Sequence, residues 1–531
     1  MKQTPSISYD CIIIGGGSAG CVLAYRLSAN PDTSVLLIEA GPQDNSWLIR
    51  MPRGYLKTHR NSRLVWRFPV CAEADRGEWS GSFIGGKVLG GTSSINSMLY
   101  VRGQPQDYDD WAAAGAPGWS WTDIGPCFKK IEDHELGESD TRGVGGPLHI
   151  SCLRDGGPMR EAVIQAGIAL GLPRRDDLNG IDQEGIGYFP TTIENGRRVS
   201  AARAFLAPIK RRRNLTIITD VAVTRIVFDG TRAVGVACAV NDALREFRAE
   251  REVILSAGAL QSPKILQLSG IGPADHLRSF KLPVICDSPG VGANLRDHWG
   301  LRLQYNLFGA SGHNWRLRRI RLWMSVLQYL MSRTGVLSTA ATEIGAFVKA
   351  MPTGSRPDAE LHIGIPGVSQ IAFLSRLECT VRSLRPESRG TVMIRSADPT
   401  SPPVIHPNVL SAEYDRQLTV HMIRYARHLL RQSPLQKHLA EETFPGRGCS
   451  SPEQIIDICR RLGSPGSHFA GTCRIGQDAM AVVDPMLRVH GVSGLRVVDC
   501  SVMPTLVSGN TNGPVMASAW RAADLILAGS T

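Results

Sequence analysis

Residues 9–20 read Tyr-Asp-Cys-Ile-Ile-Ile-Gly-Gly-Gly-Ser-Ala-Gly, and this stretch decides the fold of the chain. A run of apolar residues leads directly into three glycines with the spacing Gly-x-Gly-x-x-Gly. A segment of helical character follows through Asn30, and a second apolar run from Val35 to Ile38 ends in Glu39. Strand, glycine turn, helix, strand and acidic residue in this order predict a βαβ unit that binds a dinucleotide.

Each glycine of the motif has its own physical role. Gly15 permits the tight turn after the strand, Gly17 lets the backbone approach a pyrophosphate, and Gly20 lets the helix pack closely on the strand. Ser18 and Ala19 begin the helix, whose free N–H groups and positive dipole end would face the phosphates. A glycine-rich turn without a ligand is the alternative, and the flanking strands and helix argue against it.

Glu39 ends the second predicted strand, where its carboxylate can accept a hydrogen bond from a ribose hydroxyl. The motif by itself leaves NAD and FAD as alternatives. A second glycine-rich stretch lies at residues 85–96, Gly-Gly-Lys-Val-Leu-Gly-Gly-Thr-Ser-Ser-Ile-Asn. Glycines followed by hydroxyl groups indicate close backbone approach to an anion or a ring system. The aliphatic residues and the terminal Asn argue against the alternative, a flexible loop.

Size and charge limit the classes of protein that fit. At 531 residues the chain is long enough for two or more domains, and its net charge is +11. Arginine-rich stretches at 210–213 and 316–321 would suit nucleic acid, an anionic membrane or solvated surface. We expect solvated surface and no nucleic acid, because neither stretch interleaves aromatic residues for base stacking. Residues 315–333 predict a basic amphipathic helix with its apolar residues facing the core, and peripheral contact with a membrane is the alternative.

Cysteine usage and hydropathy bear on the compartment. The 12 cysteines are scattered without a Cys-x-x-Cys pair or paired Cys/His spacing, so we expect neither a disulfide framework nor a metal site. The first apolar run is the strand of the dinucleotide motif rather than a secretory signal. No uninterrupted apolar stretch reaches the roughly 18 residues that a spanning helix needs. We expect a cytoplasmic protein.

Several stretches of the sequence together resemble the FAD-dependent glucose–methanol–choline (GMC) oxidoreductase family. They are the two glycine motifs with Glu39, residues 258–273, residues 289–298 and a C-terminal block from His468 to Leu527. They occur in the family's order and cover essentially the whole chain. The resemblance implies an α/β (α+β two-domain) fold, with an FAD-binding Rossmann-like domain and a substrate domain whose antiparallel sheet is flanked by helices.

The resemblance also implies domain boundaries. We expect a discontinuous FAD-binding domain at residues 1–155, 200–300 and 465–531, and a substrate-binding domain at 156–199 and 301–464. Residues 389–410 alternate apolar and polar positions with proline breaks, and we expect them to add strands to the antiparallel sheet. Residues 411–440 carry a helical period.

The family's cofactor positions map onto this chain residue by residue. Val223 would contact the adenine end through its backbone, and Asp499 would lie near the ribityl chain and the pyrophosphate. Asn512 or Gly513 caps a C-terminal helix that, in the family, points its N-terminus at the flavin. The predicted FAD-binding residues are Gly15, Gly17, Ser18, Ala19, Gly20, Glu39, Val88, Gly91, Asn96, Val223, Asp499, Asn510 and Thr511.

The family removes a proton from an alcohol hydroxyl and passes the carbinol hydride to the flavin. The matching residues are His468 as the base and Asn512 as the polar group that holds the alkoxide. Asn512 as a helix cap only is the alternative. We expect His298 and His490 to be structural. Ile95 stands where some choline-oxidising relatives carry a flavin-linked His, so we expect non-covalent FAD.

The resemblance therefore implies FAD-dependent oxidation of an alcohol to an aldehyde or ketone. We expect a neutral primary alcohol in preference to choline, because no aromatic cage with a carboxylate is recognisable. The electron acceptor is expected to be a quinone or carrier, with oxygen as the alternative. Hydroxynitrile lyase or photodecarboxylase chemistry on the same fold, and a non-catalytic flavoprotein, remain open, as does the oligomeric state.

Overall fold

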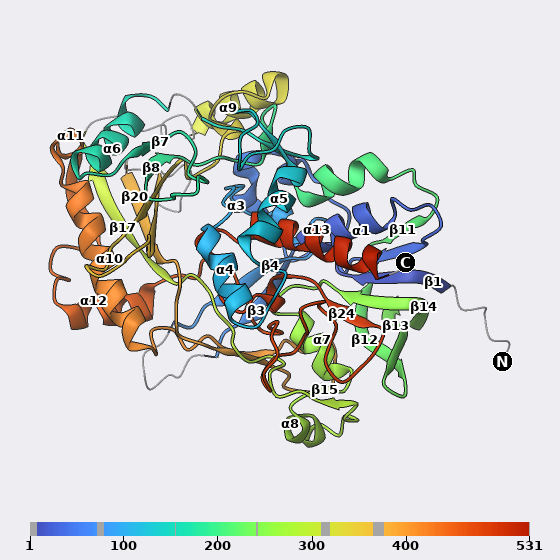
Figure 1. The fold of residues 1–531 in the computed structure, drawn as a ribbon. Helices are drawn as coiled ribbons and strands as arrows, with labels where there is room; N and C mark the ends of the chain where they lie inside the picture. The colour runs from blue at the N-terminus through green and yellow to red at the C-terminus, as the bar shows by residue number, and fades with distance from the viewer. Residues whose placement is uncertain are drawn as a thin grey trace.

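The computed structural model describes residues 8–71, 79–153, 156–240, 243–308, 319–364 and 376–529. Two large sheets dominate it, each with its own helices (Figure 1). The first sheet takes its strands from the N-terminal third, the middle and the C-terminus, and the second takes them from the segments between. This arrangement confirms the predicted two-domain α/β fold.

The first sheet has a parallel part in the order β11-β2-β1-β14-β24. Its inner strands are buried along their whole apolar runs, as parallel strands covered on both faces must be. Beyond β14 the sheet continues through antiparallel β13 and β12. The strands are β1 Ser8–Ile14, β2 Val35–Ile38, β11 Leu215–Ile218, β12 Ala222–Asp229, β13 Arg232–Val240, β14 Ala243–Leu255 and β24 Leu495–Val497.

Two helices from opposite ends of the chain cover this sheet together. α1 (Ser18–Leu27) and α13 (Asn512–Ala528) pack side by side, as their adjacent blue and red ribbons show in Figure 1. Both are rich in small and apolar residues, and most of their side chains are buried. The N-terminus of the last helix is thereby brought next to the N-terminus of the first.

The second sheet has the order β23-β17-β20-β19-β18-β8-β7 and is antiparallel except for β7 with β8. One face is apolar and packs under α6 (Pro158–Ala169), α10 (Glu413–Leu430) and α12 (Pro452–Leu462). The strands are β7 Arg174–Arg175, β8 Gly185–Tyr188, β17 Gly300–Leu307, β18 Ile344–Val348, β19 Ala359–Gly364, β20 Arg376–Ser383 and β23 Leu439–Phe444.

The opposite face of the second sheet is polar and turns toward the first domain. Because side chains alternate along a strand, Leu361 and Val381 lie in the apolar core while Glu360, His362 and Arg382 lie on the other face. His362 and Arg382 line a cavity between the two domains. The alternation of side chains along these strands thus gives the sheet one apolar face in the core and one polar face at the cavity.

One predicted part of this sheet is wrong. Residues 389–410 form β21 (Thr391–Met393) and β22 (Val404–His406), which pair with each other in a separate ribbon instead of joining the large sheet. Pro402 and Pro403 before β22 and Pro407 after it remove backbone donors, which limits β22 to three residues. The helical period at 411–440 becomes α10, which ends at Leu430 before α11 (Ser433–Gln436) and β23.

Shorter elements fill the space between the domains and around them. The remaining helices are α2 Trp47–Arg50, α3 Tyr55–Thr58, α4 Pro105–Ala113, α5 Trp121–Ile131, α7 Ser262–Leu268, α8 Ala274–Ser279 and α9 Arg319–Ser332. Two-stranded pairs are β3 Val65–Pro69 with β4 Ser82–Gly86, β5 Glu132–His134 with β6 Leu148–Ile150, β9 Ile193–Glu194 with β10 Arg197–Arg198, and β15 Ile271–Gly272 with β16 Cys286–Asp287. Within the described residues, no helix has both the length and the apolar character needed to cross a bilayer.

Candidate active site

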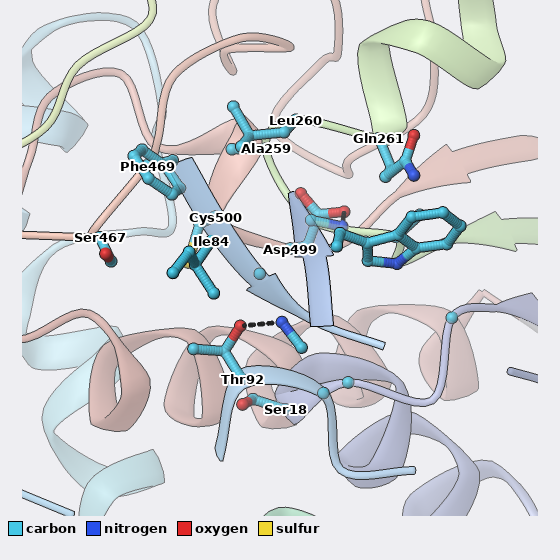
Figure 2. A pocket seen from close by; sticks show the side chains of 18 of the residues that line it. Ser18, Ile84, Thr92, Ala259, Leu260, Gln261, Ser467, Phe469, Asp499 and Cys500 are labelled. Carbon is cyan, nitrogen blue, oxygen red and sulfur yellow. Dashed lines mark hydrogen bonds between the residues drawn. The ribbon is translucent and has the colours of Figure 1, made fainter. Parts of the chain in front are cut away.

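A cavity of about 580 Å³ runs between the first sheet and the polar face of the second. The dinucleotide motif forms one end of it, and His468 with the polar strand residues forms the other. Figure 2 shows Ser18 and Thr92 on one wall and Phe469 and Leu260 on the wall across from them. The cavity therefore joins the predicted cofactor residues to the predicted catalytic histidine.

The three motif glycines lie where their predicted roles require. Gly15 has φ +99°, and a Cβ there would lie 2.5 Å from the carbonyl oxygen of Ser256. A Cβ at Gly20 would lie 2.0 Å from the carbonyl oxygen of Gly15, so only glycine permits this helix to approach the turn. A Cβ at Gly17 would meet nothing within 4 Å, and this residue forms part of the bare cavity wall. The second glycine motif packs against it, since a Cβ at Gly91 would lie 2.7 Å from the Gly17 Cα.

Glu39 lines the cavity at the end formed by the dinucleotide motif, and both oxygens of its carboxylate accept hydrogen bonds from the backbone. Oε2 accepts from the Gly16 N–H at 2.9 Å and Oε1 from the Gly41 N–H at 2.8 Å. Burial raises the pKa of Glu39 to about 7, against the lowering effect of these backbone donors. Each carboxylate oxygen can accept a further bond, so the predicted ribose contact stays available alongside a role in holding the glycine turn.

Asp499 forms the corresponding anchor from the C-terminal block. Its carboxylate accepts from the Gly258 N–H at 2.9 Å, the Ser262 hydroxyl at 2.6 Å and the Ser501 N–H at 2.7 Å. It thereby fixes the start of the second family-like stretch against the cavity. Asn96 is held in a similar way, because its Oδ1 accepts from the Arg198 guanidinium at 2.7 Å.

His468 is the centre of the other end of the cavity. It is 8% exposed, its backbone N–H donates to Asp297 Oδ1 at 2.7 Å, and its Nε2 lies 2.9 Å from the Asn510 amide nitrogen. The Asn512 side chain instead accepts from the Ser18 hydroxyl at 2.8 Å. The neighbour of the predicted base is therefore Asn510, not Asn512 as the sequence suggested.

His298 also belongs to this site, although the sequence indicated only a structural role. Its Nδ1 lies 2.8 Å from His468 Nδ1, and its Nε2 lies 2.9 Å from the carbonyl oxygen of Leu384. A carbonyl only accepts, so His298 Nε2 must carry the hydrogen. Neutral His298 then offers Nδ1 as an acceptor, and His468 must donate from its own Nδ1. The lone pair of His468 is left on Nε2, which faces the Asn510 amide.

Burial favours the neutral form of both rings. It lowers the pKa of His298 to about 4, and it lowers the pKa of His468 well below the ordinary value, with further lowering by His298 and Arg382. His490, the other histidine expected to be structural, contacts the carbonyl oxygen of Gly476 and does not line the cavity. At neutral pH, the uncharged His468 ring of this pair can therefore accept a proton.

Polar side chains of the second sheet contact one another at the His468 end of the cavity. Arg382 Nη1 lies 3.2 Å from His362 Nδ1, and His362 Nε2 lies 2.8 Å from Glu360 Oε1. Arg382 and His362 line the cavity, whereas Glu360 is buried behind them. A guanidinium is therefore the charge that this wall presents to a ligand.

Comparison of the whole chain with known proteins agrees with this geometry. The sequence pattern described as GMC oxidoreductase matches residues 9–300 in its N-terminal part and 386–519 in its C-terminal part. The chain belongs to the GMC oxidoreductase family. It is 37% identical to an alcohol dehydrogenase (acceptor) of Pseudomonas putida over 98% of this chain and 96% of that protein, and 39% identical to human mitochondrial choline dehydrogenase over 98% and 89%. The crystal structure of pyridoxine 4-oxidase from Mesorbium loti is 32% identical, with a TM-score of 0.88 over 97% of this chain and 98% of that one.

As a GMC oxidoreductase the protein is an FAD-dependent enzyme, and the cavity fits that cofactor. α1 and α13 both begin at its wall without a side-chain cap, so their first N–H groups are free to bind an anion or a polarised ring. The Ser18–Asn512 hydrogen bond ties these two helix starts together. The predicted FAD residues on the cavity wall are Gly15, Gly17, Ser18, Ala19, Glu39, Gly91, Asn96, Val223, Asp499, Asn510 and Thr511.

The other two predicted FAD residues of this GMC oxidoreductase, Gly20 and Val88, do not line the cavity. Gly20 serves the helix packing described above. Val88 is fully buried in an apolar cluster with Ile49, Val65 and Ile95. Each supports the cofactor wall from within the protein and is not part of the surface that a ligand touches.

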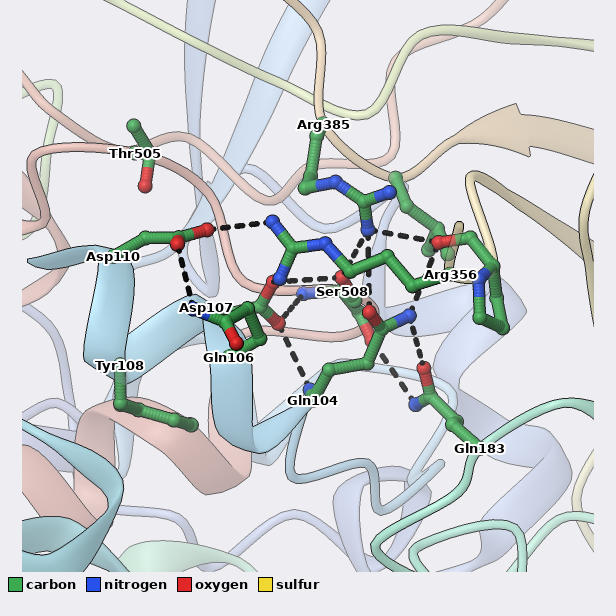
Figure 3. A network of polar contacts seen from close by, with 12 residues as sticks. Gln104, Gln106, Asp107, Tyr108, Asp110, Gln183, Arg356, Arg385, Thr505 and Ser508 are labelled. Atoms are coloured by element: carbon green, nitrogen blue, oxygen red, sulfur yellow. Dashed lines mark hydrogen bonds and ion pairs between the residues drawn. The ribbon is translucent and has the colours of Figure 1, made fainter. Parts of the chain in front are cut away.

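A network at the domain boundary positions the segment that carries Asn510. Asp107 accepts from the Ser508 N–H at 2.6 Å and hydroxyl at 2.9 Å, and Arg385 donates to the same hydroxyl at 3.0 Å (Figure 3). Arg356 adds a 2.5 Å bond to Asp110 on the same helix, α4. Ser508 is two residues before Asn510, so residues from both domains fix this loop. Sequence reasoning missed the network because its members lie far apart in the chain.

Proposed function

We propose that this GMC oxidoreductase oxidises a neutral primary alcohol to an aldehyde, with His468 as the general base. The observation that carries the proposal is the His298–His468 contact, which leaves the unprotonated Nε2 of a neutral imidazole facing the cavity. A base in this state takes the hydroxyl proton onto Nε2. FAD, when bound, accepts the carbinol hydrogen with its electron pair.

Asn510 supplies the second polar group in this proposal. Its amide nitrogen lies 2.9 Å from His468 Nε2 and donates to it in the absence of substrate. A substrate oxygen that enters between the two side chains donates its proton to Nε2 and accepts from the amide. As the proton leaves, the amide N–H stabilises the developing negative charge on that oxygen, as an oxyanion-hole donor does.

The lining of the cavity supports a neutral alcohol over choline, although several relatives are named choline dehydrogenases. Among the described residues that line it, the carboxylates are Glu39 and Asp499, both at the cofactor end. Among the lining residues at the His468 end, the charged side chain is Arg382, whose guanidinium repels a quaternary ammonium group. Trp66 and Phe68 provide apolar wall for an aliphatic or aromatic substituent.

We further propose that FAD is held non-covalently and that a quinone or carrier accepts its electrons in preference to oxygen. Ile95 lines the cavity and is 1% exposed, and its aliphatic side chain offers no nucleophile. The acceptor proposal draws on the similarity to an acceptor-type alcohol dehydrogenase and on the basic surface considered below.

The test mixes the purified holoenzyme anaerobically with a panel of alcohols and follows the flavin absorbance band. Bleaching by primary alcohols, and none by choline at the same concentration, is expected. Choline bleaching the flavin faster than neutral alcohols would overturn the substrate proposal. Absence of bleaching across the whole panel would overturn the redox proposal and favour a lyase or photochemical reaction on the same fold.

A further inference from the structure

α9 presents a wide apolar surface outward at the periphery of the molecule (Figure 1). Its exposed fractions are 74% at Trp323, 63% at Met324, 57% at Leu327, 62% at Leu330 and 80% at Met331. Leu327 lies three or four residues from each of the other four, which puts these side chains on one face of the helix. The sequence predicted that the apolar residues of this segment face the core, but these five side chains are exposed.

A different set of side chains holds α9 on the protein. Leu322, Val326 and Tyr329 pack into a small cluster with Met51 and Leu337, and the Tyr329 hydroxyl reaches the carbonyl oxygen of Arg50 at 3.5 Å. These contacts of the inner face anchor α9 on the protein without any contribution from the exposed outer face. Apolar side chains of this size, left in water by a helix that is already anchored, mark an interaction surface.

Positive charge gathers at the base of this face. Arg333 follows α9, and its carbonyl oxygen lies 2.1 Å from the position of a Cβ at Gly196, next to Arg197. The Arg50 carbonyl oxygen contacts the Tyr329 hydroxyl of α9. Desolvation, and then the charges of Arg333, Arg203 and Arg50, lower the pKa of Arg197. Glu194 pairs with Arg203 at 3.0 Å, and Asp44 interacts with Arg50 and Arg203. The four arginines outnumber these two carboxylates, which leaves the cluster with a net positive charge. The sequence from residue 309 to residue 342 contains no Asp or Glu at all.

We propose that the outer face of α9, with the adjoining arginines, docks the enzyme on an anionic lipid surface. A helix with Trp, Leu and Met on one face and arginines beside it lies in the interface of a bilayer, with its apolar side chains among the acyl chains and its cations at the phosphates. A second copy of the chain is a poorer occupant. Arg321 lies near one end of α9 and Arg333 follows the other, so antiparallel pairing of two such helices would oppose like charges.

The docked orientation has a consequence for access to the cavity. Met51, on which α9 packs, directly precedes the short segment that carries Tyr55 and His59, and both of these residues line the cavity. Lipid contact at α9 therefore brings one wall of the cavity close to the bilayer. A lipid-soluble substrate or electron acceptor would meet the enzyme on that side.

The experiment measures sedimentation of the full-length, FAD-loaded protein with vesicles. Phosphatidylcholine vesicles are compared with vesicles that also contain phosphatidylglycerol, at low and high salt. We expect binding to the anionic vesicles that weakens as salt screens the charges. The variant W323S/L327S/M331S should bind at least about tenfold more weakly. Arg50→Gln with Arg333→Gln should reduce binding to the anionic vesicles and should leave the weak binding to neutral vesicles unchanged.

The matched control is I181S/L244S, which removes two exposed apolar side chains elsewhere, 65% and 73% exposed. It should bind as the wild type does. FAD content and turnover with a soluble artificial acceptor should be unchanged in all variants, which shows that they fold. No binding to either vesicle, or equal binding by the triple variant, would overturn the proposal. A wild-type dimer that the triple variant converts to a monomer, without vesicle binding, would assign the face to a second copy instead.

Discussion

The Nδ1 atoms of His298 and His468 lie 2.8 Å apart, and this contact decides which nitrogen of His468 carries a hydrogen. Because His298 donates its Nε2 hydrogen to Leu384, it can only accept at Nδ1 while neutral. His468 is therefore held in the tautomer that a base needs. His298 is a positioning residue in this view, since it acts on the substrate only through His468.

The first prediction concerns His298→Phe, which removes the acceptor and keeps the volume apolar. The rate of flavin reduction by alcohol should fall about 10- to 100-fold, by analogy with the loss of a partner that orients a metal-ligating imidazole. His298→Gln should recover part of the rate, because its amide oxygen can accept from His468 and its nitrogen can donate to Leu384. Anaerobic stopped-flow reduction checks both variants, with FAD content as the control for folding. Equal rates in the two variants would argue against a tautomer effect.

The second prediction concerns the base itself. His468→Ala should retain FAD and reduce its flavin about 10²- to 10⁴-fold more slowly, the usual worth of a positioned base. The imidazole is active when neutral, and burial lowers its pKa, so the wild-type rate should hold through neutral pH and fall only on the acid side, below the ordinary histidine pKa. The mutant should lack that acid step. A His468→Ala enzyme that is reduced at the wild-type speed would sink the assignment.

The third prediction separates the two asparagines near the start of α13. Asn510→Ala should slow flavin reduction by about 10²- to 10³-fold, because the amide beside His468 is lost. Asn512→Ala should reduce its flavin at close to the wild-type rate and should instead hold FAD less tightly, since its side chain joins the starts of α1 and α13. Anaerobic stopped-flow reduction measures the rate of each variant, and the flavin content after dialysis measures how tightly each one holds FAD. The opposite pattern would restore the assignment made from the sequence.

The fourth prediction concerns Glu39. Its carboxylate binds two backbone N–H groups of the glycine turn and lines the cavity, so Glu39→Ala should lower FAD occupancy after extensive dialysis. Glu138→Ala is the matched control, because its side chain is 68% exposed and does not line the cavity. Equal flavin retention in the Glu39 variant and the control would remove Glu39 from the binding site.

The fifth prediction concerns the attachment of FAD. Acid precipitation of the holoenzyme should release all the yellow colour into the supernatant, because the aliphatic Ile95 side chain cannot form a bond to the flavin. A pellet that keeps its colour would show covalent attachment through another residue on the cavity wall. Mass spectrometry of the digested pellet would then identify that residue.

The sequence by itself determined the parts of this protein whose geometry is local. Gly15, Gly17 and Gly20 lie within six residues, and the turn, the bare wall and the close helix contact follow from backbone sterics at each position. The apolar runs on either side of the glycine turn predicted the two strands of a βαβ unit, and residues 11–14 and 35–38 are buried in a parallel sheet. The order of such motifs along the chain was enough to indicate the family and the cofactor.

Only the tertiary structure decided the contacts between distant segments. His298 and His468 are separated by 170 positions, and no local pattern places their Nδ1 atoms together. Asn510 and Asn512 look equivalent in the sequence, but the chain turns into α13 between them and sends one side chain to His468 and the other to Ser18. The outward face of α9 has the same cause, because an amphipathic pattern defines a stripe and the packing around it decides which way that stripe faces.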